Sequence, residues 1–100
     1  MDLKLYISPK VEKKIKDKHS VAVWEVREVW DQYNGITLED NREPHRSDPA
    51  TLWFVAATKG LRILKVIFVP RDDIETAFLR SCYEADPNAI RIFRNKGGVI

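Results

Sequence analysis

Three β-rich runs separated by short turns constrain the fold of this chain more than any other feature. They cover residues 51–58, 62–70 and 74–83, and the first turn contains Lys59-Gly60. Runs of this length and composition, joined by such short turns, predict an antiparallel meander. In the second run both sets of alternate residues are largely apolar, so we expect this strand to be covered on both faces and to lie inside the sheet.

Helical patterns lie on either side of the meander. Ser8-Pro9 pairs a capping residue with a proline suited to the first helical turn, and an apolar face follows. A second helix is predicted from five apolar residues at helical spacing, and we expect Asn34-Gly35 to end it with glycine in the left-handed position. Asp86-Pro87 begins a third helix, which Gly97-Gly98 stops. The five apolar residues of the second helix are Ala22, Val26, Val29, Trp30 and Tyr33.

The whole pattern predicts one α+β domain spanning residues 1–100. Two N-terminal helices precede an antiparallel meander of about four strands, whose first strand is residues 36–40, and a short C-terminal helix follows. Residues 3–7 indicate either a short strand or an extended lead-in. A chain of 100 residues can bury one core and leaves little room for a second domain.

Composition excludes several classes of protein. The single cysteine, Cys82, excludes an internal disulfide and fits a reducing compartment. No secretion signal is visible, and the longest mostly apolar run, residues 63–70, is too short to cross a bilayer. We therefore expect a cytoplasmic protein with no membrane partner. Two isolated histidines and one cysteine show no metal-ligand spacing, so we predict neither a metal nor a cofactor.

Positive charge is informative here through its placement, because a net charge of +2 is too small to indicate nucleic-acid binding by itself. Lys65 stands among isoleucines on one face of the second run. One interpretation is that its stem packs while its ammonium group reaches water. The other is that the cation is aimed at a phosphate.

Residues 41–46 contain the densest mixture of side chains suited to catalysis. Arg42 and Arg46 could clamp a phosphate, while Glu43 and His45 could transfer protons. Attack of an RNA 2′-hydroxyl on its own phosphate needs a base, an acid and a cation, and this segment holds all three residue types. The alternative is a charged loop that is merely solvated.

Four further residues are candidates at the ends of elements. Lys18 and His19 lie between the two N-terminal helices, where both could contact RNA, although His19 could equally be a packed or capping residue. Tyr83 could stack on a base or bond a phosphate, or be a half-buried aromatic at a sheet end. Arg80 is a further candidate RNA contact, and its parity predicts that it and Tyr83 face opposite ways if the strand is regular.

Several segments resemble the BrnT-like group of bacterial toxins, which belongs to the RelE/ParE superfamily. Residues 18–21 (Lys-His-Ser-Val) and the Glu-rich helix after them are similar to that family's Lys-His-Gly-Val segment and second helix. Residues 38–43 resemble its Asp-x-Arg-Glu segment, residues 51–56 and 61–66 its central hairpin, and residues 82–85 an Ala-Tyr-Glu-Pro pattern of one branch. The resemblance spans residues 7–96. Ser20 replaces the family's glycine, and Tyr83 lies near a position where the better-known branch carries arginine.

This resemblance implies a RelE-like fold and a metal-independent endoribonuclease of a type II toxin–antitoxin pair. Such a protein cleaves RNA through a basic sheet face and is held inactive by a cognate antitoxin. The family's functional positions map to Arg42, Glu43, Lys65 and Tyr83. Two other functions stay open, namely a non-catalytic RelE-fold module that binds or regulates a protein, and a partner protein whose exposed sheet edge pairs with another chain, for instance in a homodimer.

Overall fold

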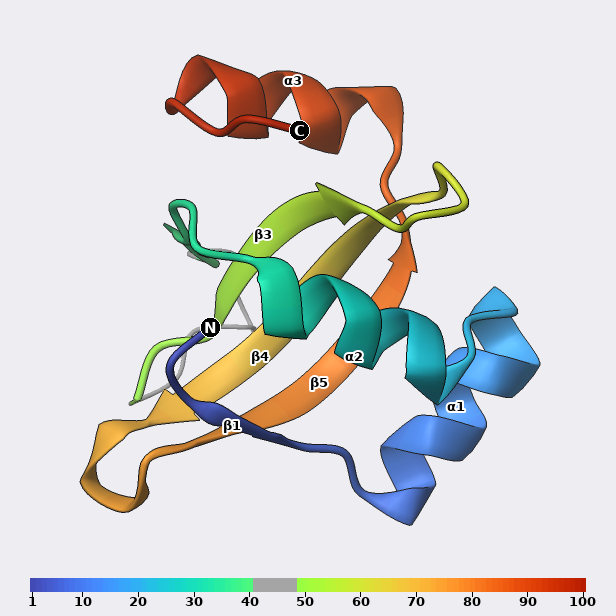
Figure 1. Cartoon of the computed structure of the whole chain (residues 1–100), viewed down its shortest axis with the longest axis vertical. Helices are drawn as coiled ribbons and strands as arrows, with labels where there is room; N and C mark the ends of the chain where they lie inside the picture. The colour runs from blue at the N-terminus through green and yellow to red at the C-terminus, as the bar shows by residue number, and fades with distance from the viewer. Residues whose placement is uncertain (41–48) are drawn as a thin grey trace.

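The computed structural model describes residues 1–40 and 49–100, and within them three helices surround one five-stranded sheet (Figure 1). The predicted α+β class is confirmed, as are two helices before the meander and one behind it. In chain order the elements are β1 (Lys4–Tyr6), α1 (Pro9–His19), α2 (Val23–Gln32), β2 (Leu38–Glu39), β3 (Leu52–Ala57), β4 (Ile63–Arg71), β5 (Thr76–Glu84) and α3 (Pro87–Asn95), with a short 3-10 turn, η1 (Asp72–Ile74), between β4 and β5.

The sheet has the strand order β1-β5-β4-β3-β2, so β4 is central, as predicted. Strands β2 to β5 form an antiparallel meander. Strand β1 adds a fifth, edge strand that pairs parallel to β5, with Leu5 opposite Ala77, so the sheet is mixed rather than purely antiparallel. Strand β1 lies within residues 3–7, where a short strand was one of two predicted alternatives, but the predicted meander of about four strands did not include it, because three residues are too few to show a clear alternation. Strand β2 is also shorter than the predicted residues 36–40.

Local capping signals begin α1 and α3 where they were predicted. The Ser8 hydroxyl accepts a hydrogen bond from the Val11 N–H at 3.2 Å, and the Asp86 carboxylate accepts one from the Ala89 N–H at 2.7 Å. Each helix has its proline in the first turn, where the missing N–H would have no helical partner. Side-chain acceptors at these positions satisfy helical N–H groups that would otherwise be unpaired.

The end of α2 differs from the prediction. We expected Gly35 to take a left-handed conformation, but among the described glycines only Gly97 has a positive φ of this kind. Instead Tyr33 leaves the helix in an extended conformation, and its hydroxyl donates to the Ile36 carbonyl. A Cβ on Gly35 would lie 2.7 Å from the Tyr33 hydroxyl oxygen, so this glycine leaves room for the Tyr33 ring, and its own dihedral angle does not call for glycine.

Helices cover both faces of the sheet. Helix α2 crosses one face (Figure 1), where the ring of Tyr33 stacks on Phe54 with centroids 4.0 Å apart and Trp30 contacts Phe68 edge-on at 5.0 Å. Residue 53 has the opposite parity to residue 54, and Trp53 contacts Phe93 of α3, with centroids 6.1 Å apart. Helix α3 therefore lies over the other face, which is also the face of Lys65.

A β-bulge interrupts the pairing of β4 and β5. Ile67 pairs with Ser81 whereas Phe68 pairs with Leu79, so Arg80 has no partner on β4. The extra residue reverses the alternation of faces along β5. Leu79 therefore shares the α2 face with Cys82, and the strand does not meet the condition of regularity under which Arg80 and Tyr83 were expected to face opposite ways.

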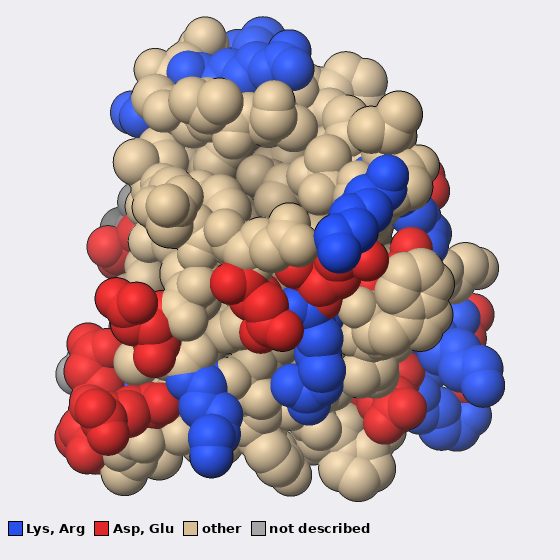
Figure 2. All heavy atoms as spheres, viewed as in Figure 1, with Lys and Arg blue, Asp and Glu red and all other residues tan. Residues whose placement is uncertain are grey.

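The α2 face carries charges of both signs. Figure 2 shows carboxylates and cations interspersed over its lower half and a largely uncharged band between α2 and α3. Basic side chains at the upper edge lie over α3. In the described part of the chain, this face thus offers no continuous positive surface, whereas Lys65 lies on the opposite face.

Candidate functional site

Tyr83 lines three hollows in the described surface. Their volumes are about 530, 290 and 380 Å³. Each is lined by Tyr83 together with at least one basic or aromatic side chain from another element. We name five of these residues the Tyr83 cluster: Tyr83, His19, Lys14, Lys65 and Arg80.

The sheet register brings Lys65 and Tyr83 together. They are direct cross-strand partners on β4 and β5, and Val55 of β3 lies opposite Lys65 on its other side. Side chains of directly paired residues are neighbours on one face. The sequence places these two residues eighteen positions apart, and only the pairing of β4 with β5 makes them one site.

Lys65 is held between two aromatic rings. Its ammonium nitrogen lies 4.4 Å from the centroid of the Trp53 ring and 5.9 Å from that of Tyr83. A cation this close to ring faces is attracted by their electron-rich surfaces. The lysine is half-buried, and with Trp53 and Tyr83 it lines the 290 Å³ hollow beneath the start of α3. The packing of the lysine agrees with the first of its two predicted interpretations, and the second, a cation aimed at a phosphate, stays a prediction.

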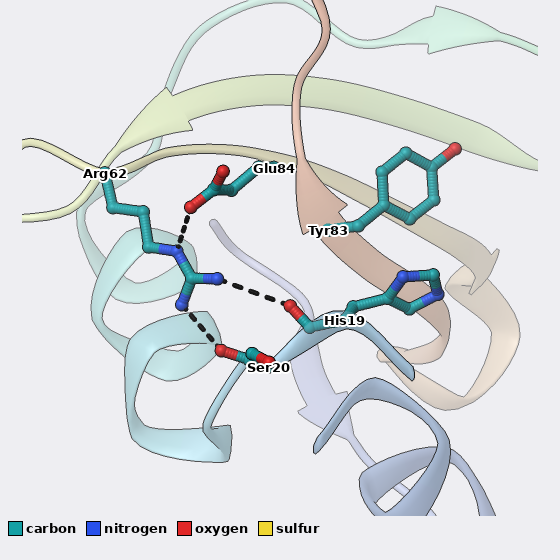
Figure 3. A pocket seen from close by; sticks show the side chains of 5 residues that line it. All are labelled: His19, Ser20, Arg62, Tyr83 and Glu84. Atoms are coloured by element: carbon teal, nitrogen blue, oxygen red, sulfur yellow. Dashed lines mark hydrogen bonds and ion pairs between the residues drawn. The ribbon is translucent and has the colours of Figure 1, made fainter. Parts of the chain in front are cut away.

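His19 reaches the cluster from the last turn of α1. Its ring centroid lies 5.1 Å from that of Tyr83, with an angle of 47° between the planes. Both rings border the 530 Å³ hollow, and they lie next to each other in Figure 3. An imidazole can accept and release protons under physiological conditions, and an aromatic neighbour can stack on a base. The two residues thus combine a proton-transfer group with a base platform.

Lys14 and Arg80 add positive charge beside the third hollow. The Lys14 ammonium group donates to the Arg80 carbonyl at 2.6 Å. Burial lowers the pKa of Lys14, and the positive charges of Arg80, Lys18 and Lys10 lower it further. Crowded cations of this kind favour an anion, because a bound anion would relieve their mutual repulsion.

Arg80 lines the same hollow as Tyr83, contrary to the opposite facing that a regular strand requires. The bulge is the physical reason, because Arg80 is the extra residue and does not follow the alternation. The arginine is exposed, and its guanidinium group can reach solvent at the rim of the site.

Negative charge is also present at the site. Asp40, which is 7 % exposed, lines both the 290 and 380 Å³ hollows, and Asp86 lines the first of these. Asp86 is occupied as the cap of α3. The carboxylates make the Lys65 side of the site mixed in charge, and the Lys14 and Arg80 side is the more positive.

The predicted residues divide into three groups. Lys65, Tyr83, His19 and Arg80 come together around the three hollows. Lys18 is exposed on α1, where its charge contributes to the field at Lys14. Arg42, Glu43, His45 and Arg46 lie outside the described residues, and their roles remain predictions.

Sequence reasoning missed Lys14, Trp53 and Arg62. The sequence predicts Lys14 as one of many solvent-facing lysines, and no local pattern separates it from Lys13 or Lys16. Trp53 is predicted as a core or rim residue, and it is buried, but its ring also contacts the ammonium group of Lys65. One feature of the sequence pointed to Arg62, because the alternation of residues along the strand places this charged side chain on the same face as Leu64, which is buried.

Cys82 takes no part in the site. Its side chain is fully buried on the α2 face, and burial raises the pKa of its thiol to about 12, with a further contribution from the negative charge of Glu25. A thiol that stays protonated is a poor nucleophile and metal ligand. Among the described residues, no three His, Cys, Asp or Glu side chains are grouped so that they could hold one metal ion.

Comparison with known proteins finds no matching family model and no matching curated protein. The resemblance to BrnT-like toxins therefore stays a prediction from the sequence. None of the helices described here has both the length and the apolar character needed to cross a bilayer.

Proposed function

We propose that this protein is a metal-independent endoribonuclease of the type II toxin class, and that the Tyr83 cluster binds its RNA substrate. The observation that carries the proposal is the convergence of a histidine, a tyrosine and three cations from α1, β4 and β5 around three hollows that all share Tyr83 in their lining. Single-stranded RNA is recognised by aromatic stacking and by positive charge, and the cluster offers both. The RelE-like character of the fold and the cognate antitoxin are part of the same proposal.

The reaction is attack of a 2′-hydroxyl on the adjacent phosphorus. A base removes the hydroxyl proton as the 2′-oxygen–phosphorus bond forms, and an acid protonates the 5′-oxygen as its bond to phosphorus breaks. The products are a 2′,3′-cyclic phosphate and a 5′-hydroxyl end. Lys65, Lys14 and Arg80 would stabilise the charge on the phosphate, and Tyr83 would orient a base. His19 is the described residue suited to proton transfer, with Glu43 and His45 as further predicted candidates.

The first test is cleavage of labelled RNA by purified protein in EDTA, with and without ribosomes. Lys65→Met keeps the apolar stem and removes the charge, and Lys13→Met is the matched control, because the Lys13 ammonium group pairs with Asp17 on the exposed side of α1. Loss of one hydrogen bond to a charged phosphate weakens transition-state binding by about 1.5–3 kcal/mol, or about 10- to 100-fold in rate. Equal rates for the two variants, or no cleavage under either condition, would contradict the proposal.

A non-catalytic RelE-fold binding module is the second candidate. It is favoured by the packing of Lys65 against Trp53 and Tyr83, since a lysine held by two rings also suits a purely structural or protein-binding surface. The same assay separates the two functions. RNA that binds without being cut, or that does not bind at all, would favour this second function.

A further inference from the structure

Arg62 joins three parts of the molecule around the 530 Å³ hollow (Figure 3). Its Nε donates to Glu84 at 2.7 Å and its Nη1 to Glu25 at 2.9 Å. Nη1 also donates to the Ser20 carbonyl at 2.8 Å, and Nη2 donates to the His19 carbonyl at 3.3 Å. The arginine therefore links the end of α1, the first turn of α2 and the end of β5.

These bonds leave the guanidinium group little capacity for a ligand. A guanidinium carries five N–H groups, and four hydrogen bonds to the protein already occupy most of them. The neighbouring carboxylates of Glu25 and Glu84 also neutralise its charge. Arg62 lines the largest of the three hollows, yet a phosphate clamp would have to break these bonds.

The contacts of Arg62 fall on the residues that set the position of the two rings. It holds the backbone carbonyl of His19 itself, and on β5 it holds Glu84, the residue directly after Tyr83. Ser20, whose carbonyl it also holds, has a φ of 54°, a left-handed conformation that a serine adopts at a cost. Arg62 thus fixes a strained corner beside His19 to the strand that carries Tyr83.

We propose that Arg62 is a positioning residue that holds the His19 ring against Tyr83, and this proposal rests on the proposed nuclease function of that site. Its guanidinium group acts through the backbone of α1 and does not touch the substrate. A misplacement of a catalytic group by about 1 Å can cost about 100-fold in rate, so a residue that sets the spacing of the two rings controls turnover.

Two variants test the proposal. Arg62→Lys keeps the charge, but a single ammonium group cannot span two carbonyls and two carboxylates. The double variant R62M/E25Q removes the charged pair together. In the native protein the Glu25 carboxylate accepts a hydrogen bond from the Ala22 N–H at 3.0 Å. The amide oxygen that the double variant has at position 25 can still accept this bond, so the start of α2 stays capped. Arg71→Ala is the control, since Arg71 pairs with Asp73 beside the distant β4–β5 turn.

The first measurement is NMR of the free protein. We expect the ring protons of His19 to lose their cross-peaks to Tyr83 and their ring-current shift in both Arg62 variants, with Tyr83→Leu as the reference for complete loss. The Arg71→Ala protein should keep both signals. Persistence of the His19–Tyr83 contact in a folded Arg62 variant would overturn the proposal.

The second measurement is cleavage kinetics of the same proteins. We expect kcat to fall about 10- to 100-fold in the Arg62 variants with KM nearly unchanged, because the arginine does not bind RNA. An unchanged kcat despite the lost contact would also overturn the proposal. If the wild-type protein cleaves no RNA, the proposed function fails, and the NMR result alone then decides whether Arg62 positions His19.

Discussion

Replacing Ser20 with glycine is expected to stabilise the protein. Ser20 follows α1 with a φ of 54° and a ψ of 38°, and the neighbouring Val21 N–H closes the helix end by donating to the Ile15 carbonyl at 3.0 Å. This is the left-handed corner that commonly ends helices and that glycine adopts without a steric penalty. The glycine that the family resemblance would place here is thus the residue that the backbone favours.

The magnitude follows from two opposing terms. A residue with a Cβ costs about 1–2 kcal/mol in the left-handed conformation, and glycine removes this cost. Glycine also makes the unfolded chain more flexible, which opposes folding by about 0.5–1 kcal/mol. The exposed serine makes no hydroxyl hydrogen bond that the described structure records, so we expect a net gain of about 0.5–1 kcal/mol. For a domain of this size the midpoint of thermal unfolding should rise by about 2–8 °C.

Urea unfolding followed by tryptophan fluorescence measures the gain directly, because Trp30 and Trp53 are buried in the native protein. The midpoint should rise while the slope m stays constant, since the buried surface does not change. Ser20→Ala is the control, as alanine keeps the Cβ and should give no gain. A lower midpoint for Ser20→Gly, or an equal gain for Ser20→Ala, would refute the reasoning.

Three further predictions concern packing, titration and charge. Gly98→Ala should destabilise the protein by about 1–3 kcal/mol, because its Cβ would lie 2.2 Å from the buried ring of Phe93. Gly60→Ala is the control and should change the urea midpoint little, because a Cβ there would lie 3.7 Å from its nearest neighbouring atom. Cys82 should react with a thiol reagent only after denaturation. Because its pKa is raised from 9.0 to about 12 in the folded protein, its contribution to the free energy of unfolding should be lost as pH rises through that interval. Cys82→Val should flatten this part of the stability–pH curve. Lys14→Met should weaken RNA binding and reduce the slope of log affinity against log salt by about 0.7, an effect that would be absent if Lys14 did not face phosphate.

The choice between nuclease and binding module depends on proton transfer. Binding needs the cations and rings of the Tyr83 cluster, whereas cleavage also needs an acid and a base at bonding distance from the ribose and the leaving oxygen. Among the described cluster residues His19 is the group suited to that role, and Arg62 holds its backbone. Comparison of RNA affinity with cleavage rate in His19→Gln therefore tests proton transfer. The cleavage rate should fall much more than the affinity if His19 transfers a proton, and the two should fall together if its ring only binds RNA.

The sequence by itself determined the elements whose signals are local. Ser8-Pro9 and Asp86-Pro87 begin helices because their side-chain acceptors and prolines act within one turn, and the central strand follows from apolar residues on both faces. Only the tertiary structure decided which distant residues meet. Strand β1 pairs parallel to β5, the bulge at Arg80 reverses the faces of that strand, and Lys65, Tyr83 and His19 become neighbours through pairing and packing across the chain. Periodicity along a strand records alternation between two faces, but it contains neither the partner strand nor the extra residue that shifts the register.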